Sequence, residues 1–354
     1  MNNGIPSGAL IGQNLIKQNR LRDITNAAFA GSDSNKVNIY IDLSNILSPL
    51  LSESFNPDAM LHENEIAANV INMIMHYRTF YWKYYKVATE FHLVWSTNCP
   101  TVAQMFYANY NLAYINNRKY SGHKIDIIIA NMVVLQEVLQ YIPDCSLTLG
   151  TFETGVIMSY IMRHNQDPHP NIIITKDIMT MQAACNNPNT VIFRPVKKSG
   201  EDESIFINPH GNGIIDYLCD LRKTKRPDLI RVISPKLIGA ILAMTRVPER
   251  GVKSLLNLST ALQAIDAAIC KDSLLNDYNS NCITVAQALE SNIATKLLSG
   301  SINDRFKAID QEYQLICFNN NPERLNYIGC MNKSNEQELH KLLTEKFHGI
   351  ELKI

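Results

Sequence analysis

The sequence predicts an α/β protein with a parallel sheet, followed by a helical region. Short apolar runs alternate with helical periods through the first two thirds of the 354 residues, a pattern typical of parallel sheets with connecting helices. The runs are nearly continuous in Ile, Val and Leu, as expected of strands buried on both faces. After Pro227 the pattern changes, and from Pro235 onward only helical periods are evident.

Five apolar runs are predicted as strands, and the segments between them as helices. The strands are expected at Val37–Ile41, Phe91–Trp95, Ser146–Leu149, Asn171–Thr175 and Val191–Pro195. The helices are expected at His62–Tyr85, Ile125–Leu139, Glu153–Arg163 and Met179–Ala184. Lys197–Glu203 is charged and predicted as a hairpin loop, and Ser334–Phe347 as an amphipathic tail.

The amino-acid composition restricts the classes of protein to which the chain can belong. Hydrophobic residues make up 46% of the chain and charged residues 19%, a balance typical of a folded globular protein. The formal net charge is zero, so no overall basic field indicates nucleic acid, although a local basic face remains open.

Targeting signals and cysteine spacing indicate a compartment. The eight cysteines include no CxxC pair, which fits neither a zinc site nor a small disulfide scaffold, so free thiols in a reducing, cytoplasmic compartment are expected. We expect no signal peptide and no membrane partner, since no basic leader precedes an apolar run and no stretch approaches about 18 apolar residues.

Three carboxylates form the predicted site. Asp42 and Asp177 come at the ends of the first and fourth predicted strands, and Glu153 opens the helix between the third and fourth. The carboxyl edge of a parallel sheet is where ligands gather, and oxygen ligands suit a hard cation such as Mg²⁺ or Mn²⁺. An equally good interpretation has Asp42 and Asp177 capping the helices that follow them, with Glu153 favouring a helix N-terminus.

Two further segments indicate contact with nucleic acid. Residues 102–124 interleave tyrosines with basic residues, which suits stacking on bases and pairing with phosphates; these are Tyr107, Tyr110, Tyr114, Tyr120, Arg118, Lys119, His123 and Lys124. The alternative is that the tyrosines pack on the core.

The second segment is residues 247–255, where a tight turn at Gly251 enters a helix. Such a turn leaves backbone N–H groups free to hold a phosphate. Lys253 adds positive charge there, and Arg250 partly offsets the negative charge of Glu249.

The chain divides into four predicted regions. Residues 1–36 are an extension rich in Asn, Gly and Ser; it is either a mobile terminus or a docking arm for a larger assembly. Residues 37–226 form the α/β core, residues 227–330 the helical region, and residues 331–354 a C-terminal tail.

The order of these motifs resembles the 5′ nuclease family, which comprises flap endonucleases, phage 5′–3′ exonucleases and the nuclease domain of bacterial DNA polymerase I. Phe152–Ile157 is similar to the family motif Glu-Ala-Asp-Asp-Val-Ile with Glu153 at its first position, and Thr175–Gln182 to Thr-Gly-Asp-Lys-Asp-Leu-Leu-Gln. Val247–Leu255 is similar to Val-Pro-Gly-Ile-Gly-Pro-Lys-Thr-Ala. The resemblance runs from about Val37 to about Phe318.

The resemblance implies a PIN-like nuclease core with a helical arch, followed by a helix–three-turn–helix DNA-binding region. Asp42, Glu153 and Asp177 match acids of the metal site. Tyr107, Tyr110 and Arg118 look like the residues that open the family's helical arch, and Lys119 and Lys124 are expected as further nucleic-acid contacts. Arg250, Gly251 and Lys253 fall at the DNA-binding turn. The implied partner is DNA, as a flap, a 5′ end or a single strand, or RNA.

The chain departs from the family where acids are expected. Ser96, Gly155, Val156 and Met179 stand at family acid positions. Because a two-metal clamp needs many carboxylates, one ion is expected rather than two. Two functions stay open: a Mg- or Mn-dependent 5′–3′ exonuclease or flap endonuclease, and an inactive pseudo-nuclease within a larger complex. The Asn- and Ile-rich composition suits a viral or phage protein in its host cell.

A third interpretation is an unrelated doubly wound α/β enzyme. It is weakened by the sequence itself, which contains neither a GxGxxG loop nor a Walker motif. Such loops are what usually hold a nucleotide phosphate on that fold.

Overall fold

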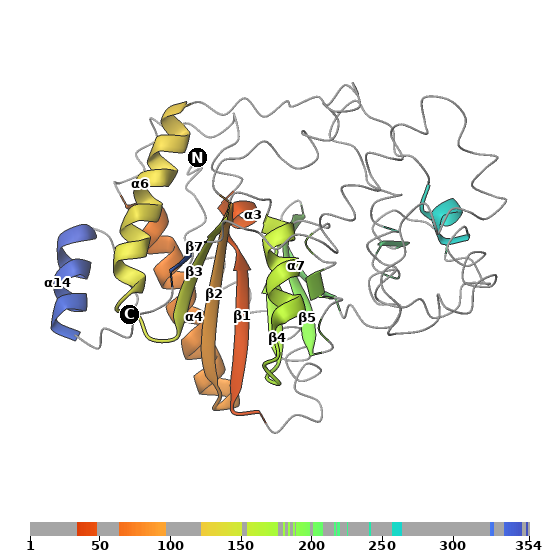
Figure 1. Ribbon diagram of the computed structural model, residues 1–354, viewed down its shortest axis with the longest axis horizontal. Coiled ribbons are helices and arrows are strands. Elements are labelled where there is room, and N and C mark those ends of the chain that lie inside the picture. Colours follow the sequence, from red (N-terminus) through yellow and green to blue (C-terminus); the bar gives the residue numbers. More distant parts are fainter. Residues whose placement is uncertain are drawn as a thin grey trace.

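The computed structural model contains a seven-stranded sheet with helices on both faces (Figure 1). It describes residues 34–47, 64–96, 122–150, 154–175, 180, 183–184, 187, 189–198, 201–207, 216, 218–219, 225, 241, 257–263, 326–328, 336–348 and 352. The strand order is β6-β5-β4-β1-β2-β3-β7. The predicted α/β class is therefore confirmed.

Five strands form a continuous parallel sheet in the order β3-β2-β1-β4-β5. They are β1 (Lys36–Asp42), β2 (Ala88–Ser96), β3 (Cys145–Gly150), β4 (Asn171–Ile174) and β5 (Thr190–Lys198). Each overlaps one of the five predicted apolar runs. Every residue of β4 is buried, and so is β1 after Lys36, as expected of parallel strands covered on both faces.

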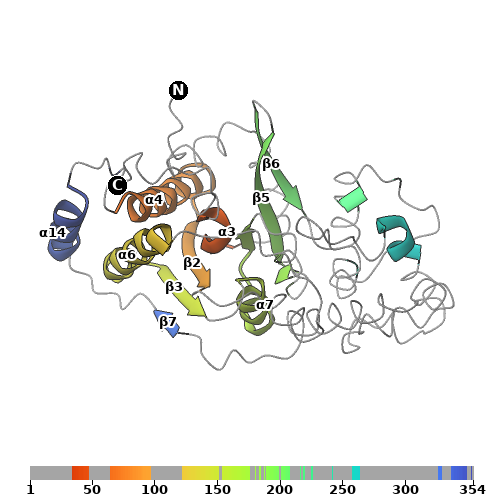
Figure 2. The same cartoon turned by 90° about the horizontal axis from the view of Figure 1, so that it is seen from above.

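Helices α4 (Glu65–Tyr85) and α6 (Gly122–Leu139) cover one face of the sheet, and α7 (Thr154–His164) lies on the opposite face (Figure 2). The short helix α3 (Leu43–Leu47) directly follows β1. Under α4 and α6, alternate residues of the strands join one apolar core, including Ile39, Phe91 and Leu147. This core fixes the strand register, because a one-residue slip would turn the apolar side chains to the other face.

The face beneath α7 carries more polar residues. Asn38, Tyr40 and Asp42 alternate with the core residues of β1, and in register beside the first two lie Glu90 and His92 of β2. Side chains in a strand alternate between faces, so these residues share one side of the sheet. The polar face has two ends, one at the beginning of the strands and one at their carboxyl edge.

Two short antiparallel strands complete the edges. β6 (Glu201–Ile207) pairs with β5 and forms the predicted hairpin. The predicted loop Lys197–Glu203 is too long, because five of its seven residues belong to β5 or β6. β7 (Asn326–Ile328) pairs with β3, with Leu147 opposite Ile328. The expectation that no strand follows Pro235 is wrong at this point, because three residues are too few to give a periodic signal.

The helix α14 (Glu336–Lys346) matches the predicted amphipathic tail and packs on α6. Phe347 is buried in the main core, Lys346 forms an ion pair with Glu137 of α6, and Asn64 donates a hydrogen bond to the backbone oxygen of Lys346. The segment after residue 326 therefore contributes to the same core as the first strands.

Two smaller findings bear on the sequence expectations. Among the helices that the structure describes, none is long and apolar enough to cross a bilayer. Cys145 and Cys219 are buried free thiols.

Candidate functional site

The strand order locates a candidate site at the carboxyl edge of the sheet. From β1 the chain proceeds to β2 and β3 on one side, and β4 and β5 lie on the other side. In open parallel sheets, ligands bind outside the carboxyl ends of the strands where the order reverses in this way. Here that point lies between β1 and β4.

Asp42 ends β1 at this point. Ile41 is in register with Ile174, the last residue of β4, so Asp42 and Thr175 follow as neighbours. Both side chains are fully buried, and the Thr175 hydroxyl donates a hydrogen bond of 2.8 Å to Oδ2 of Asp42. Burying a carboxylate is costly unless it is hydrogen-bonded or paired, and this hydroxyl meets part of that need.

The N-terminal turn of α7 lies close to Thr180. A Cβ atom added at Gly155 would lie 3.2 Å from the Oγ1 of Thr180, a separation that forces the neighbour to move. Thr180 is itself completely buried. Glycine fits this close contact, and an aspartate at this position, as in the resembling motif, would require Thr180 to shift by a few tenths of an ångström.

The end of β2 is a second place where an acid of the resembling family is replaced. Ser96 is the last residue of β2 and lies in register with Gly150 of β3. At this strand end the resembling family has an aspartate. The carboxyl edge therefore has one strand-end carboxylate, Asp42, on β1 and none on the last residue of β2.

The other predicted site residues lie outside the described part of the chain. These are Glu153, Asp177, Tyr107, Tyr110, Arg118, Lys119, Arg250, Gly251 and Lys253. Lys124 lies within α6, where only the backbone is described. In the sequence, Glu153 directly precedes α7, and Asp177 follows Thr175 by two residues.

The donors at the carboxyl edge suit a hard cation. A carboxylate and a hydroxyl are oxygen ligands of the kind that Mg²⁺ and Mn²⁺ take. Across the described ranges no group of three His, Cys, Asp or Glu side chains is arranged to hold a metal ion. Of the predicted trio, Asp42 is the member within those ranges, so it fits as one ligand of a site that needs further acids.

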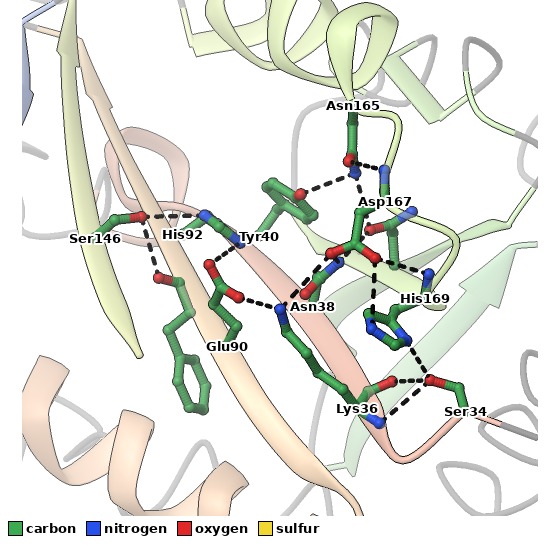
Figure 3. Close-up of polar contacts among 12 residues, drawn as sticks. Ser34, Lys36, Asn38, Tyr40, Glu90, His92, Ser146, Asn165, Asp167 and His169 are labelled. Carbon is green, nitrogen blue, oxygen red and sulfur yellow. Dashed lines mark hydrogen bonds and ion pairs between the residues drawn. The ribbon is translucent and has the colours of Figure 1, made fainter. Parts of the chain in front are cut away.

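A second polar cluster, not predicted from the sequence, lies at the opposite end of the same face (Figure 3). Lys36 at the start of β1 forms ion pairs with Glu90 of β2 and Asp167 of the loop before β4. His92 lies 3.5 Å from Glu90, and His169 lies 3.7 Å from Asp167, measured between ring Nε2 and carboxylate oxygen. We call these five residues the amino-edge cluster.

Asparagines extend the amino-edge cluster inward. The side-chain amide of Asn38 donates to Asp167 and to Asn171, at 3.1 Å in both cases. Asn165 also donates to Asn171, and Asn171 donates to Asn187. Asn171 is completely buried. These bonds tie β1, β4 and the loops around residues 165 and 187 together.

The pKa values in the amino-edge cluster follow from these contacts. Burial lowers the pKa of His92 and outweighs the opposing effect of Glu90. Burial alone would raise the pKa of Asp167, but hydrogen bonds from the backbone of His169 and the side chain of Asn38 lower it. For Lys36, burial is opposed by Glu90 and Asp167, and the pKa is raised.

The amino-edge cluster was missed although a sequence signal was present. Lys36, Asn38, Glu90 and His92 occupy alternate positions in two adjacent strands, and polar residues at a period of two indicate a shared face. Because these charges satisfy one another, we interpret the cluster as structural.

Comparison with known proteins adds no relative. No protein-family model matches the chain, and no curated protein matches its sequence.

Proposed function

We propose that the chain is a PIN-like protein of the 5′ nuclease type that binds nucleic acid and hydrolyses phosphodiester bonds with one Mg²⁺ or Mn²⁺ ion. The observation that carries the proposal is the position of Asp42. This buried carboxylate ends the central strand of a parallel sheet at the point where the strand order reverses. Ligands of such sheets bind there.

The proposed ligands are Asp42, Glu153 and Asp177. A bound cation would lower the pKa of a coordinated water and balance negative charge on the phosphate. In this arrangement Asp42 holds the cation, and the Thr175 hydroxyl fixes the orientation of its carboxylate through the 2.8 Å hydrogen bond. Such a contact to a metal-binding carboxylate commonly tunes metal affinity.

The proposed nucleic-acid contacts are those expected from the sequence. Tyr107 and Tyr110 would stack on bases, and Arg118, Lys119 and Lys124 would pair with phosphates. Arg250, Gly251 and Lys253 would hold a duplex phosphate at the turn that enters a helix. DNA and RNA ends are both candidates.

A pseudo-nuclease is the second candidate, and a specific observation favours it. Asp42 has no exposed surface and is already hydrogen-bonded by Thr175. Together with Ser96 and Gly155 at positions where the family has acids, this suits a site whose carboxylate now stabilises the fold. Under this alternative the chain binds nucleic acid, or joins a larger assembly, without cutting.

The test is cleavage of a labelled 5′-flap DNA in Mg²⁺ and in Mn²⁺, with Asp42→Asn, Asp177→Asn and Glu153→Gln beside the wild type. Losing one metal ligand should lower the rate by at least about a hundredfold, since a positioned charge at the reacting phosphate contributes on that order. Binding of Mn²⁺, followed by calorimetry, should weaken in the same variants.

Asp144→Asn is the matched control. Asp144 is exposed, directly precedes β3 at the amino edge, and has a φ of 54°, a conformation that Asn tolerates well. It should cut as the wild type does. No cutting by the wild type in either metal, with flap binding retained and unchanged in Asp42→Asn, would reject the nuclease and leave the pseudo-nuclease.

A further inference from the structure

The C-terminal end of α4 presents two large aromatic side chains to solvent. Trp82 is 62% exposed and Tyr84 is 40% exposed. The other aromatic residues of this run behave differently, because Phe80 and Tyr81 are buried and Tyr85 packs against the core. Phe80, Tyr81 and Tyr85 therefore serve the folding of the helix, and Tyr84 also touches Phe80, with ring centres 5.1 Å apart. Folding leaves the larger exposure, that of Trp82, unexplained.

Each exposed ring has a lysine ammonium beside it. Nζ of Lys86 lies 5.9 Å from the centre of the Trp82 ring, and Nζ of Lys83 lies 5.3 Å from that of Tyr84. Both distances are within the range of cation–π contacts. We call Trp82, Lys83, Tyr84 and Lys86 the α4-end patch.

The lysines of this patch differ from Lys36 and Lys346, which each form ion pairs. Within the described ranges, neither Lys83 nor Lys86 has a carboxylate partner. No acidic residue occurs between Glu65 and Glu90 in the sequence. Cations near a helix C-terminus are favoured by the helix dipole, which accounts for the lysines but not for the exposed rings.

Exposed aromatic rings beside lysine ammonium groups suit one class of ligand in particular. Single-stranded nucleic acid offers base faces that stack on aromatic side chains and phosphates that pair with cations, without needing a particular sequence. An acidic peptide would use the lysines alone, and an apolar protein surface would use the rings alone. We infer that the α4-end patch binds a short single-stranded segment of DNA or RNA.

The patch is remote from the carboxyl edge. Two residues separate the end of α4 from the start of β2, and Ala88 of β2 is in register with Lys36 at the start of β1. Asp42 is at the other end of β1, about 20 Å away at roughly 3.3 Å per residue. Figure 1 shows the end of α4 beside the beginnings of β1 and β2. The inference does not rest on the proposed function and needs no metal.

The test is binding of a fluorescein-labelled twelve-residue oligo-dT in EDTA at about 50 mM salt, followed by anisotropy. Trp82→Ala should weaken binding at least about fivefold, the low end of what one stacked base contributes. Alanine is favoured in helices, so this variant should stay folded. In a Trp95→Phe background, where Trp82 is the remaining tryptophan, the oligonucleotide should quench the indole fluorescence.

A pair of double variants tests the charge. Lys83→Ala with Lys86→Ala should weaken binding and lower the slope of log Kd against log salt by about 1.4, from about 0.7 for each phosphate contact. Lys225→Ala with Lys341→Ala is the matched control, because it removes two exposed lysines elsewhere. The control should bind as the wild type does.

Three results would overturn the inference. They are unchanged binding in Trp82→Ala, equal weakening in the two double variants, and binding of anionic phospholipid vesicles without binding of the oligonucleotide. Because EDTA removes any metal-dependent contribution, failure of cleavage at Asp42 and failure of binding at α4 are separate outcomes.

Discussion

The two ends of the polar sheet face differ in how their charges are satisfied. At the amino edge, Lys36 meets two carboxylates, and each carboxylate also lies near a histidine. At the carboxyl edge, the buried Asp42 accepts a hydrogen bond from the Thr175 hydroxyl. A network of mutually satisfied charges stabilises strand placement, whereas Asp42 lies at the edge where ligands of parallel sheets bind and is the proposed metal ligand. Variants at each end should therefore differ in their effects.

The largest effect is expected at Asn171, which accepts hydrogen bonds from Asn38 and Asn165 and donates one to Asn187. Asn171→Ala should lower the free energy of unfolding by about 3 kcal/mol, since it leaves several buried groups with fewer partners. Urea unfolding measures this. Gln337→Ala, at an exposed position of α14, should change it by less than about 0.5 kcal/mol. A loss below about 1 kcal/mol in Asn171→Ala would argue against a structural network.

A smaller effect is expected at the carboxyl edge. Thr175→Val removes the donor to Asp42 and should cost about 2 kcal/mol, the range for hydrogen bonds to charged groups. Thr175→Ser keeps the hydroxyl and is the control.

If Asp42 binds a cation, MnCl₂ should raise the melting temperature of the wild type and not that of Asp42→Asn. Stabilisation of both proteins by the same amount would assign Asp42 a structural role alone.

The smallest effect concerns pH. Burial lowers the pKa of His92, so the folded protein binds fewer protons than the unfolded chain, and stability should fall as the pH drops through the ordinary histidine range near 6.5. His92→Gln should reduce this fall, measured by urea unfolding at pH 7.5 and 5.5. The charged groups that act on the pKa of His92 are Glu90, Lys36 and Asp167. The pKa of Asp167 is lowered from its ordinary value, so this carboxylate does not titrate between pH 7.5 and 5.5.

His340→Gln serves as the control for the pH experiment, since His340 is exposed on α14. It should leave the pH dependence unchanged. The same change of stability with pH in His92→Gln and the wild type would show that the amino edge does not resist protonation.

The parallel sheet was predictable because its strands are buried on both faces. Ile172–Ile174 carries no polar residue, so the existence of a buried strand could be predicted. The alternation of such runs with helical periods predicted that the strands are parallel. β7 could not be predicted, because Asn326–Ile328 is too short for a period and its partner β3 is far away in sequence. The resemblance to PIN-like nucleases stays a prediction.

The site was predictable in part. The position of Asp42 at a strand end followed from the apolar run before it, but its contact with Thr175 depends on β1 and β4 being neighbours. Strand order is not visible in local sequence. The amino-edge cluster was missed for the same reason, since Lys36, Glu90 and Asp167 come from three separate segments.

The pairing of β7 with β3 has a consequence for synthesis of the protein. Leu147 lies opposite Ile328, so a ribosome adds about 180 further residues before the edge of β3 meets its neighbour. During that interval, β3 can expose unpaired backbone groups, which are a template for association with other chains. Shortened forms that stop before residue 326 should therefore aggregate even when the parallel strands are intact.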